Sequence, residues 1–113
     1  MKLTPLPLLA IIILTLGCTH CDFIEDKVKA AKEEVNYCTA DSDCIATSGF
    51  GCPFGCYTLA NKNADLSKIK DWTELYRSLG CPESFCTYMC VMPPKPGELK
   101  CVQDKCVDSR FTN

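Results

Sequence analysis

The stretch Cys38-Thr39-Ala40-Asp41-Ser42-Asp43-Cys44 opens the part of the chain that decides its fold. Two cysteines flank a polar loop, and we expect this loop to turn tightly and run into a strand at residues 44–47. Asp41 and Asp43 are expected to accept hydrogen bonds from nearby backbone N–H groups. Calcium binding is the alternative, but the loop lacks the further oxygen ligands, the glycine and the terminal glutamate of an EF-hand.

The density of cysteine sets the class of fold. The chain has 11 cysteines in 113 residues, which is the composition of a disulfide scaffold. In such domains each bridge contributes ~2–4 kcal/mol and compensates for a small hydrophobic core. Disulfides persist outside the reducing cytosol. We therefore predict a small disulfide-rich α+β domain with two helices, short strands and a C-terminal β-hairpin.

A first helix is expected before the loop, at residues 22–36. Asp22 and Glu25 have the spacing of a capping pair. Apolar residues recur at helical spacing and predict one buried face, formed by Ile24, Val28, Ala31 and Val35. This helix either packs on the domain or stands as a stalk. We favour packing, because Cys21 could join its base to the body.

A second helix is expected at residues 63–79. Asn61 or Asn63 could cap its start, and Gly80 stands where a C-terminal glycine belongs. The stripe expected to face the core consists of Leu66, Ile69, Trp72 or Thr73, Tyr76 and Leu79.

The C-terminal segment predicts a hairpin. Residues 98–102 and 105–109 form its arms around Gln103-Asp104, with Cys101 in one arm and Cys106 in the other. Residues 91–97 contain three prolines, so we expect them to be extended and then to turn.

The segment of residues 48–57 is rich in glycine and aromatic residues. Phe50, Phe54 and Tyr57 would be costly to expose in so small a domain, so one interpretation places them in the core around the bridges. The other is an exposed aromatic loop that grips a partner, since aromatic side chains are favoured interface anchors. Both interpretations remain open at this point.

The N-terminus resembles an export signal. Lys2 gives a positive region, residues 6–16 give an apolar core and Gly17 is a small residue before the cleavage point. The core has 11 residues, well short of the ~20 that span a bilayer as a helix. We therefore expect residues 1–17 to be a signal peptide.

Leu14-Thr15-Leu16-Gly17-Cys18 resembles the lipobox of prokaryotic lipoproteins, in which Gly or Ala precedes a lipidated cysteine. Thr15 departs from the motif, because leucine is usual there. The resemblance implies that Cys18 becomes the N-terminus and carries acyl chains. Two or more chains hold a protein at a membrane. The alternative is simple cleavage, which would leave Cys18 as a further disulfide partner.

Cysteine parity agrees with lipidation, because removing Cys18 from 11 cysteines leaves an even number. The expected organisation is a lipid-anchored N-terminus with the first helix at 18–36, and a cysteine-rich domain at 37–113. The expected location is the cell membrane, facing outside the cytoplasm, with membrane lipid as a partner through acylated Cys18.

The cysteine-rich part resembles a group of small exported prokaryotic proteins described as eight-cysteine-cluster proteins. The resemblance covers residues 37–108 and rests on these features: Cys38-x2-Asp41-x-Asp43-Cys44, Gly51-Cys52-x3-Cys56-Tyr57, Asn61-Lys62, Cys81 with Cys86, and Cys101-x4-Cys106. It implies a compartment and a scaffold but no activity.

The same resemblance implies which cysteines form the cluster: Cys38, Cys44, Cys52, Cys56, Cys81, Cys86, Cys101 and Cys106. It leaves Cys21 and Cys90, which would form a fifth bridge that ties the first helix to the body. The sequence does not otherwise choose among on the order of 900 connectivities of ten cysteines.

Several functional classes are disfavoured. His20 is the one histidine, so a Ser/His or Cys/His pair has no base within the domain, and we expect no enzyme. Cys18-Thr19-His20-Cys21 lacks the following histidine of a haem attachment site. We expect no cofactor and no metal, because paired Cys-x-x-Cys knuckles are missing. A net charge of −2 without a basic stripe argues against nucleic acid.

The leading functional hypothesis is a lipid-anchored binding or structural module with a protein partner at the cell surface. Its candidate contacts are Phe50, Phe54, Tyr57, Pro94 and Lys95. The alternative is a protease inhibitor that presents residues 92–96, although proline after Lys95 makes a poor bond for trypsin-like enzymes. A third class is a thiol-redox or metal-binding protein.

Overall fold

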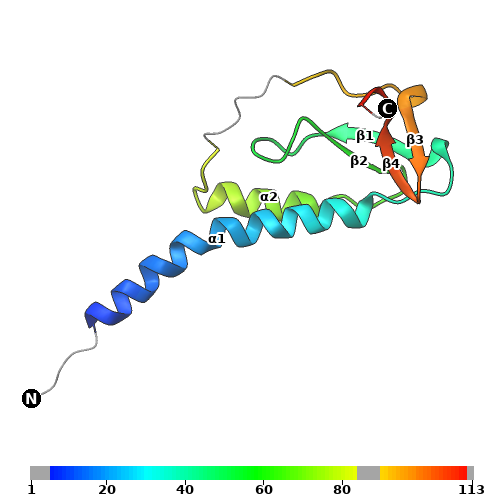
Figure 1. The fold of residues 1–113 in the computed structure, drawn as a ribbon. Helices are drawn as coiled ribbons and strands as arrows, with labels where there is room; N and C mark the ends of the chain where they lie inside the picture. Colours follow the sequence, from blue (N-terminus) through cyan, green and yellow to red (C-terminus); the bar gives the residue numbers. More distant parts are fainter. Residues whose placement is uncertain (1–5, 84–89, 112–113) are drawn as a thin grey trace, which may run out of the picture.

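The computed structural model describes residues 6–83 and 90–111, with side chains from residue 20 onward. The elements in chain order are α1 (Leu6–Val35), η1 (Asp41–Asp43), β1 (Cys44–Ser48), β2 (Tyr57–Asn61), α2 (Ser67–Ser78), η2 (Pro96–Glu98), β3 (Leu99–Val102), β4 (Lys105–Asp108) and η3 (Ser109–Phe111). Figure 1 shows α1 and α2 side by side as one layer, with both hairpins on one face of that layer. The predicted disulfide-rich α+β fold is confirmed.

Helix α1 begins earlier than predicted. It is continuous from Leu6, so Asp22 lies inside the helix and does not cap it. The leucines and the alanine in the apolar segment are good helix formers, and no proline follows Pro7 before the end of the helix. The predicted inner face is confirmed, with exposures of 7% or less at Ile24, Val28, Ala31 and Val35.

The two helices are antiparallel and pack against each other. A disulfide joins Cys21 of α1 to Cys81, just after α2. At the other end, Lys68 and Glu34 form an ion pair of 3.1 Å. The packing of the first helix on the domain is therefore confirmed. The main core contains Ile24, Val28, Ala31, Val35, Phe54, Ala60, Ile69, Tyr76 and Cys81.

Tyr76 is the largest fully buried side chain. Its hydroxyl donates to the carbonyl of Pro82 at 2.7 Å and lies 3.1 Å from Glu25 Oε1. Its ring meets Phe54 edge-on, with centroids 5.0 Å apart. Burial, with the neighbouring carboxylate of Glu25, raises the pKa of Tyr76 to about 12.

Helix α2 starts later than predicted, at Ser67, because Asp65 Oδ1 accepts a hydrogen bond from the Ser67 amide at 2.9 Å. Asn61 does not cap the helix; its side chain accepts from the amide of Asn63. Thr73 occupies the buried face, with 1% exposure. Trp72 is partly buried at the edge of the core, and Leu79 is 52% exposed, so Leu79 does not join the core as expected.

Two antiparallel hairpins complete the fold. β1 pairs with β2, which the sequence analysis did not predict, and β3 pairs with β4. The second hairpin turns at Gln103 and Asp104, with φ of 50° and 63°. Two successive residues at positive φ are typical of the tight type I′ hairpin turn. The predicted C-terminal hairpin is confirmed.

The end of α2 is a Schellman motif. Gly80 has a φ of +69°. Its amide donates to the carbonyl of Arg77 at 3.0 Å, and the amide of Cys81 donates to the carbonyl of Tyr76 at 3.2 Å. This is the pattern that requires a left-handed residue after the helix, so the predicted role of Gly80 is confirmed.

Replacing this glycine isolates the backbone effect. A Cβ at Gly80 meets no atom within 4 Å, so Gly80→Ala should destabilise the fold through the left-handed conformation alone, by about 1 kcal/mol. Gly97→Ala is the matched control, because its Cβ also meets nothing and its φ is not positive. Urea unfolding with disulfides intact measures both variants. Equal effects would contradict the assigned role of Gly80.

Candidate functional site

The disulfide framework is the most extensive chemical feature of the domain. Four bridges join cysteines within residues 6–83 and 90–111: Cys21–Cys81, Cys38–Cys101, Cys44–Cys106 and Cys56–Cys90. Cys52 is also disulfide-bonded. The predicted disulfide bonding is therefore confirmed for these nine cysteines. Cys86 lies outside the described residues.

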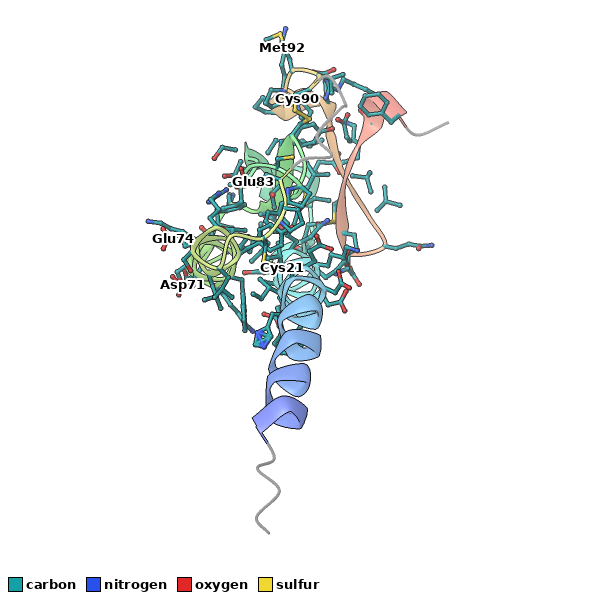
Figure 2. All side chains as sticks on the ribbon, turned by 90° about the vertical axis from the view of Figure 1, so that its left-hand side faces the viewer. Cys21, Asp71, Glu74, Glu83, Cys90 and Met92 are labelled. Atoms are coloured by element: carbon teal, nitrogen blue, oxygen red, sulfur yellow. A yellow bond between two sulfur atoms is a disulfide. The ribbon has the colours of Figure 1, made fainter. Side chains whose placement is uncertain are left out.

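The implied bridge between Cys21 and Cys90 is wrong. The antiparallel helices bring Cys81 to Cys21 with a Cα–Cα distance of 5.6 Å, and Cys90 pairs with Cys56. Figure 2 shows Cys90 on the far side of the body from Cys21. The expectation that Cys21 joins the first helix to the body is nevertheless confirmed.

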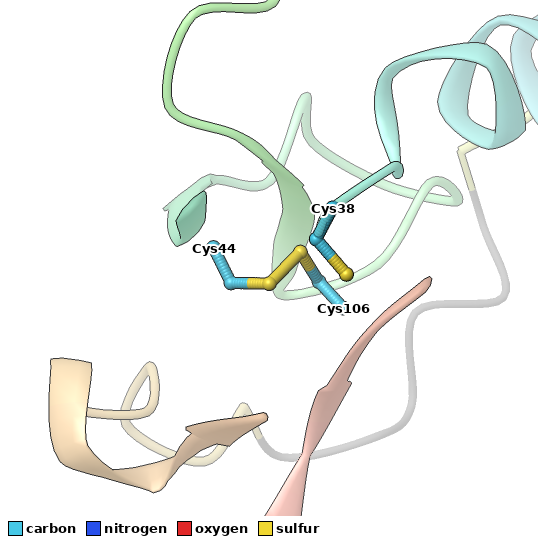
Figure 3. Close-up of side chains that lie close together, drawn as sticks. All are labelled: Cys38, Cys44 and Cys106. Carbon is cyan, nitrogen blue, oxygen red and sulfur yellow. A yellow bond between two sulfur atoms is a disulfide. The ribbon is translucent and has the colours of Figure 1, made fainter. Parts of the chain in front are cut away.

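Two of the bridges lie side by side and hold the C-terminal hairpin. Cys101 and Cys106 are direct neighbours across β3 and β4. Their partners are Cys38 and Cys44, which flank the polar loop. The sulfurs of Cys38, Cys44 and Cys106 lie within 4.8 Å of one another (Figure 3). A metal would need thiolates here, and the bridges occupy these sulfurs, so we interpret the cluster as structural.

Both aspartates of the polar loop accept backbone hydrogen bonds, but only Asp43 makes the local bonds that were expected. Asp43 Oδ2 accepts hydrogen bonds from the amides of Thr39 and Ala40 at 2.9 and 3.1 Å. Asp41 Oδ1 accepts from the Cys101 amide at 2.8 Å, across to β3. These backbone bonds lower the pKa of both carboxyls. Asp43 therefore closes the loop through bonds to nearby amides, as predicted. Asp41 attaches the loop to β3.

The predicted partner contacts are only partly accessible. Phe54 is 7% exposed and belongs to the core, and Pro94 is also buried. Phe50 and Tyr57 are half-buried, whereas Lys95 is exposed. The prediction is therefore wrong for Phe54 and Pro94, and the core interpretation of Phe54 is confirmed.

Two cations of the helices bond to the backbone of the aromatic loop. Lys32 of α1 donates to the carbonyl of Phe54 at 2.7 Å, and partial burial lowers the pKa of Lys32. Arg77 of α2 donates to the carbonyl of Phe50. Both bonds attach the loop to the helices, which the spacing of the aromatic residues could not indicate.

A charged network that the sequence analysis missed joins β2 to β4. The Tyr57 hydroxyl donates to Asp108 Oδ2 at 2.6 Å. Arg110 donates to both carboxylate oxygens of Asp108, with Nη2–Oδ2 at 2.7 Å. These bonds, led by those from Arg110, hold the pKa of Asp108 well below its usual range. Alternation from buried Cys106 could have indicated that Asp108 faces inward.

Two exposed apolar residues precede the predicted contacts Pro94 and Lys95 in the segment after Cys90. We name residues 91–95 the tip. Val91 is 49% exposed and Met92 is 79% exposed. Figure 2 places Met92 at the extreme of the molecule opposite the N-terminal part of α1.

A shallow depression lies beside the polar loop. It encloses about 560 Å³ and is lined by Tyr37, Cys38, Thr39, Asp43, Asn61, Asn63 and Asp104. The carboxylate of Asp43 and the amide of Asn61 are already engaged in bonds within the fold. The tip is therefore the stronger candidate for a partner.

Comparison of the chain with protein-family models, with curated proteins and with solved structures finds no match. Within the described part of the chain, neither helix combines the length and apolarity that crossing a membrane requires.

The Asp108 network predicts a particular pH dependence. Asp108 has a lowered pKa in the folded chain, so its contribution to stability is full above the unfolded-state pKa of about 4 and is lost as the pH falls towards the folded-state pKa. Asp108→Asn should lower the melting temperature at pH 7, and the difference from the unaltered protein should shrink below pH ~4.

The control is Asp104→Asn, at an exposed turn position where asparagine tolerates positive φ. It should leave the melting temperature equal to that of the unaltered protein, both at pH 7 and below pH ~4. A deficit of Asp108→Asn that stays constant from pH 7 to pH 2 would contradict the assigned ionisation of Asp108.

Disulfide mapping tests the framework directly. Under non-reducing conditions, trypsin with a glutamate-specific protease cuts after Arg77 and Glu83, which separates Cys81 from Cys90. Mass spectrometry should then find the peptide of Cys21 linked to residues 78–83, which contain Cys81, and residues 84–98, which contain Cys90, linked to the peptide 35–62 that contains Cys56. A peptide joining Cys21 to Cys90 would refute the framework.

Proposed function

We propose that this protein is a lipid-anchored, outward-facing binding module that presents its tip to a protein partner at the cell surface. The observation that carries the proposal is the 79% exposure of Met92 at the end of the molecule opposite the start of α1 (Figure 2). Acyl chains on Cys18 would hold the start of the mature chain at the membrane, so this arrangement keeps the tip accessible.

The tip has the properties of a braced contact loop. The Cys56–Cys90 bridge holds its first end. At its other end the Lys95 amide donates to Glu98 Oε1 at 3.0 Å, and buried Pro94 anchors the middle. A loop that is already ordered loses little conformational entropy on binding.

The side chains of the tip define the partner's chemistry. Methionine adapts to irregular apolar surfaces, so Val91 and Met92 suit an apolar pocket. Lys95 is exposed beside them and suits an acidic rim. The proposed partner is therefore a cell-surface protein with an apolar pocket bordered by carboxylates.

Site-specific cross-linking tests this function. A photoreactive residue at position 92 in the native membrane should give one discrete adduct. The control is position 102, since Val102 is 50% exposed on β3 but lies outside the tip. Adducts at both positions, or at neither, would overturn the proposal.

The purified partner then provides the quantitative test. Met92→Ala should weaken its binding by roughly 30-fold, which corresponds to the loss of ~2 kcal/mol expected for an interface anchor. Val102→Ala should leave the affinity unchanged. If the unaltered protein, Met92→Ala and Val102→Ala bind the partner with equal affinity, the tip is not the contact.

A protease inhibitor is the second candidate function. The observation that favours it is that residues 92–96 lie between two disulfide-bonded cysteines, Cys90 and Cys101, because inhibitors present braced loops. Pro93 follows Met92 and Pro96 follows Lys95, and proline after the cleavage position opposes this role. Incubation of the oxidised protein with a panel of serine proteases separates the candidates, since the proposed module inhibits none of them.

A further inference from the structure

An exposed apolar strip crosses the two helices at the other end of the domain. Trp72 and Leu75 of α2 and Leu79 at its C-cap follow one another at helical spacing. Leu75 and Leu79 are 41% and 52% exposed. From α1, Phe23 is 55% exposed and meets Trp72 edge-on, with ring centroids 6.3 Å apart. We name these four residues the helical strip.

The strip lies next to the expected point of lipid attachment. Phe23 follows Cys18 by five residues, which corresponds to ~7.5 Å along a helix. The Cys21–Cys81 bridge holds the end of α2, just beyond Leu79, against the same part of α1. Acyl chains on Cys18 would therefore keep the strip close to the bilayer surface.

The orientation of the layers agrees with this placement. Figures 1 and 2 show the N-terminal part of α1 leaving the body on the side of the helix layer, with the strands on the opposite side. A bilayer that holds Cys18 therefore faces the helices and not the hairpins.

The composition of the strip suits a membrane interface. Tryptophan is enriched where hydrocarbon meets water, because its ring is apolar and its N–H can still bond. Lys27 Nζ lies 5.2 Å from the centre of the Phe23 ring, and its long stem allows the charge to stay in water. Asp71 and Glu74 are exposed on α2, so attraction to anionic lipid is not expected to contribute.

We propose that the helical strip inserts into the interfacial region of the bilayer that holds the acyl chains of Cys18. This inference rests on the proposed lipid anchor and adds to it a fixed orientation of the domain on the membrane. The domain then lies on its helix layer, with the hairpins and the tip directed away from the membrane.

Trp72 is a native probe of this contact, because it is the one tryptophan of the chain. The acylated protein is reconstituted in phosphatidylcholine vesicles whose acyl chains are brominated near the headgroup. We expect it to float with the vesicles, its emission to shift to the blue, and at least half of its fluorescence to be quenched. Adding phosphatidylglycerol should not increase the quenching.

Matched variants separate the strip from the anchor. Leu75→Ser with Leu79→Ser changes two exposed positions, so the fold should persist, as far-ultraviolet circular dichroism can verify. This variant should still float but lose most of the quenching. Val102→Ser, at a residue of similar exposure on β3, should float and keep the full quenching.

The outcomes distinguish the inference from the function on which it rests. Flotation with unquenched Trp72 would overturn the docking of the strip and leave the anchor intact. Failure to float would overturn the anchor and the inference together. A blue shift that depends on protein concentration without vesicles would assign the strip to a second copy of the chain and refute the membrane contact.

Discussion

The fold depends above all on the neighbouring bridges Cys38–Cys101 and Cys44–Cys106. A two-stranded hairpin is at best marginally stable by itself, and the small cluster around Leu99 is shared between β3–β4, the polar loop and the first hairpin. The two bridges fasten adjacent positions of this hairpin to both ends of the polar loop. Asp41 and the Asp108 network then fix its orientation with hydrogen bonds. The C-terminal part is thereby held against β1 and β2 without a large apolar surface.

The remaining bridges attach the helices and the loops to this centre. Cys21–Cys81 closes the antiparallel helix pair, and Cys56–Cys90 brings the tip to the start of β2. The consequence is a domain with two chemically different ends. The helix layer presents an apolar strip beside the proposed lipid anchor, whereas the tip is displayed on the opposite side (Figure 2). This polarity is what we expect of a surface module with one side for the membrane and one for a partner.

The sequence predicted those features that depend on local pattern. The buried faces of both helices follow from apolar spacing, the end of α2 from Gly80, and the C-terminal hairpin from its two short arms. The pairing of Cys21 with Cys81 was not predictable, because it depends on how α1 and α2 approach each other. Phe54 is likewise buried against residues of distant segments, such as Tyr76 of α2. The contacts of Asp108 also join distant segments, and the burial of Pro94 within the tip depends on packing that no local pattern indicates.

The intact mass of the protein purified from its native membrane, with and without alkylation of thiols, tests the lipid anchor and the disulfide framework together. We expect a chain that begins at Cys18, carries acyl chains and gains no mass on alkylation. Acylation would establish the anchor, and unreactive cysteines would establish the oxidised framework. An unacylated soluble chain with alkylatable thiols would contradict both, and would favour redox or metal chemistry at the Cys38, Cys44 and Cys106 cluster.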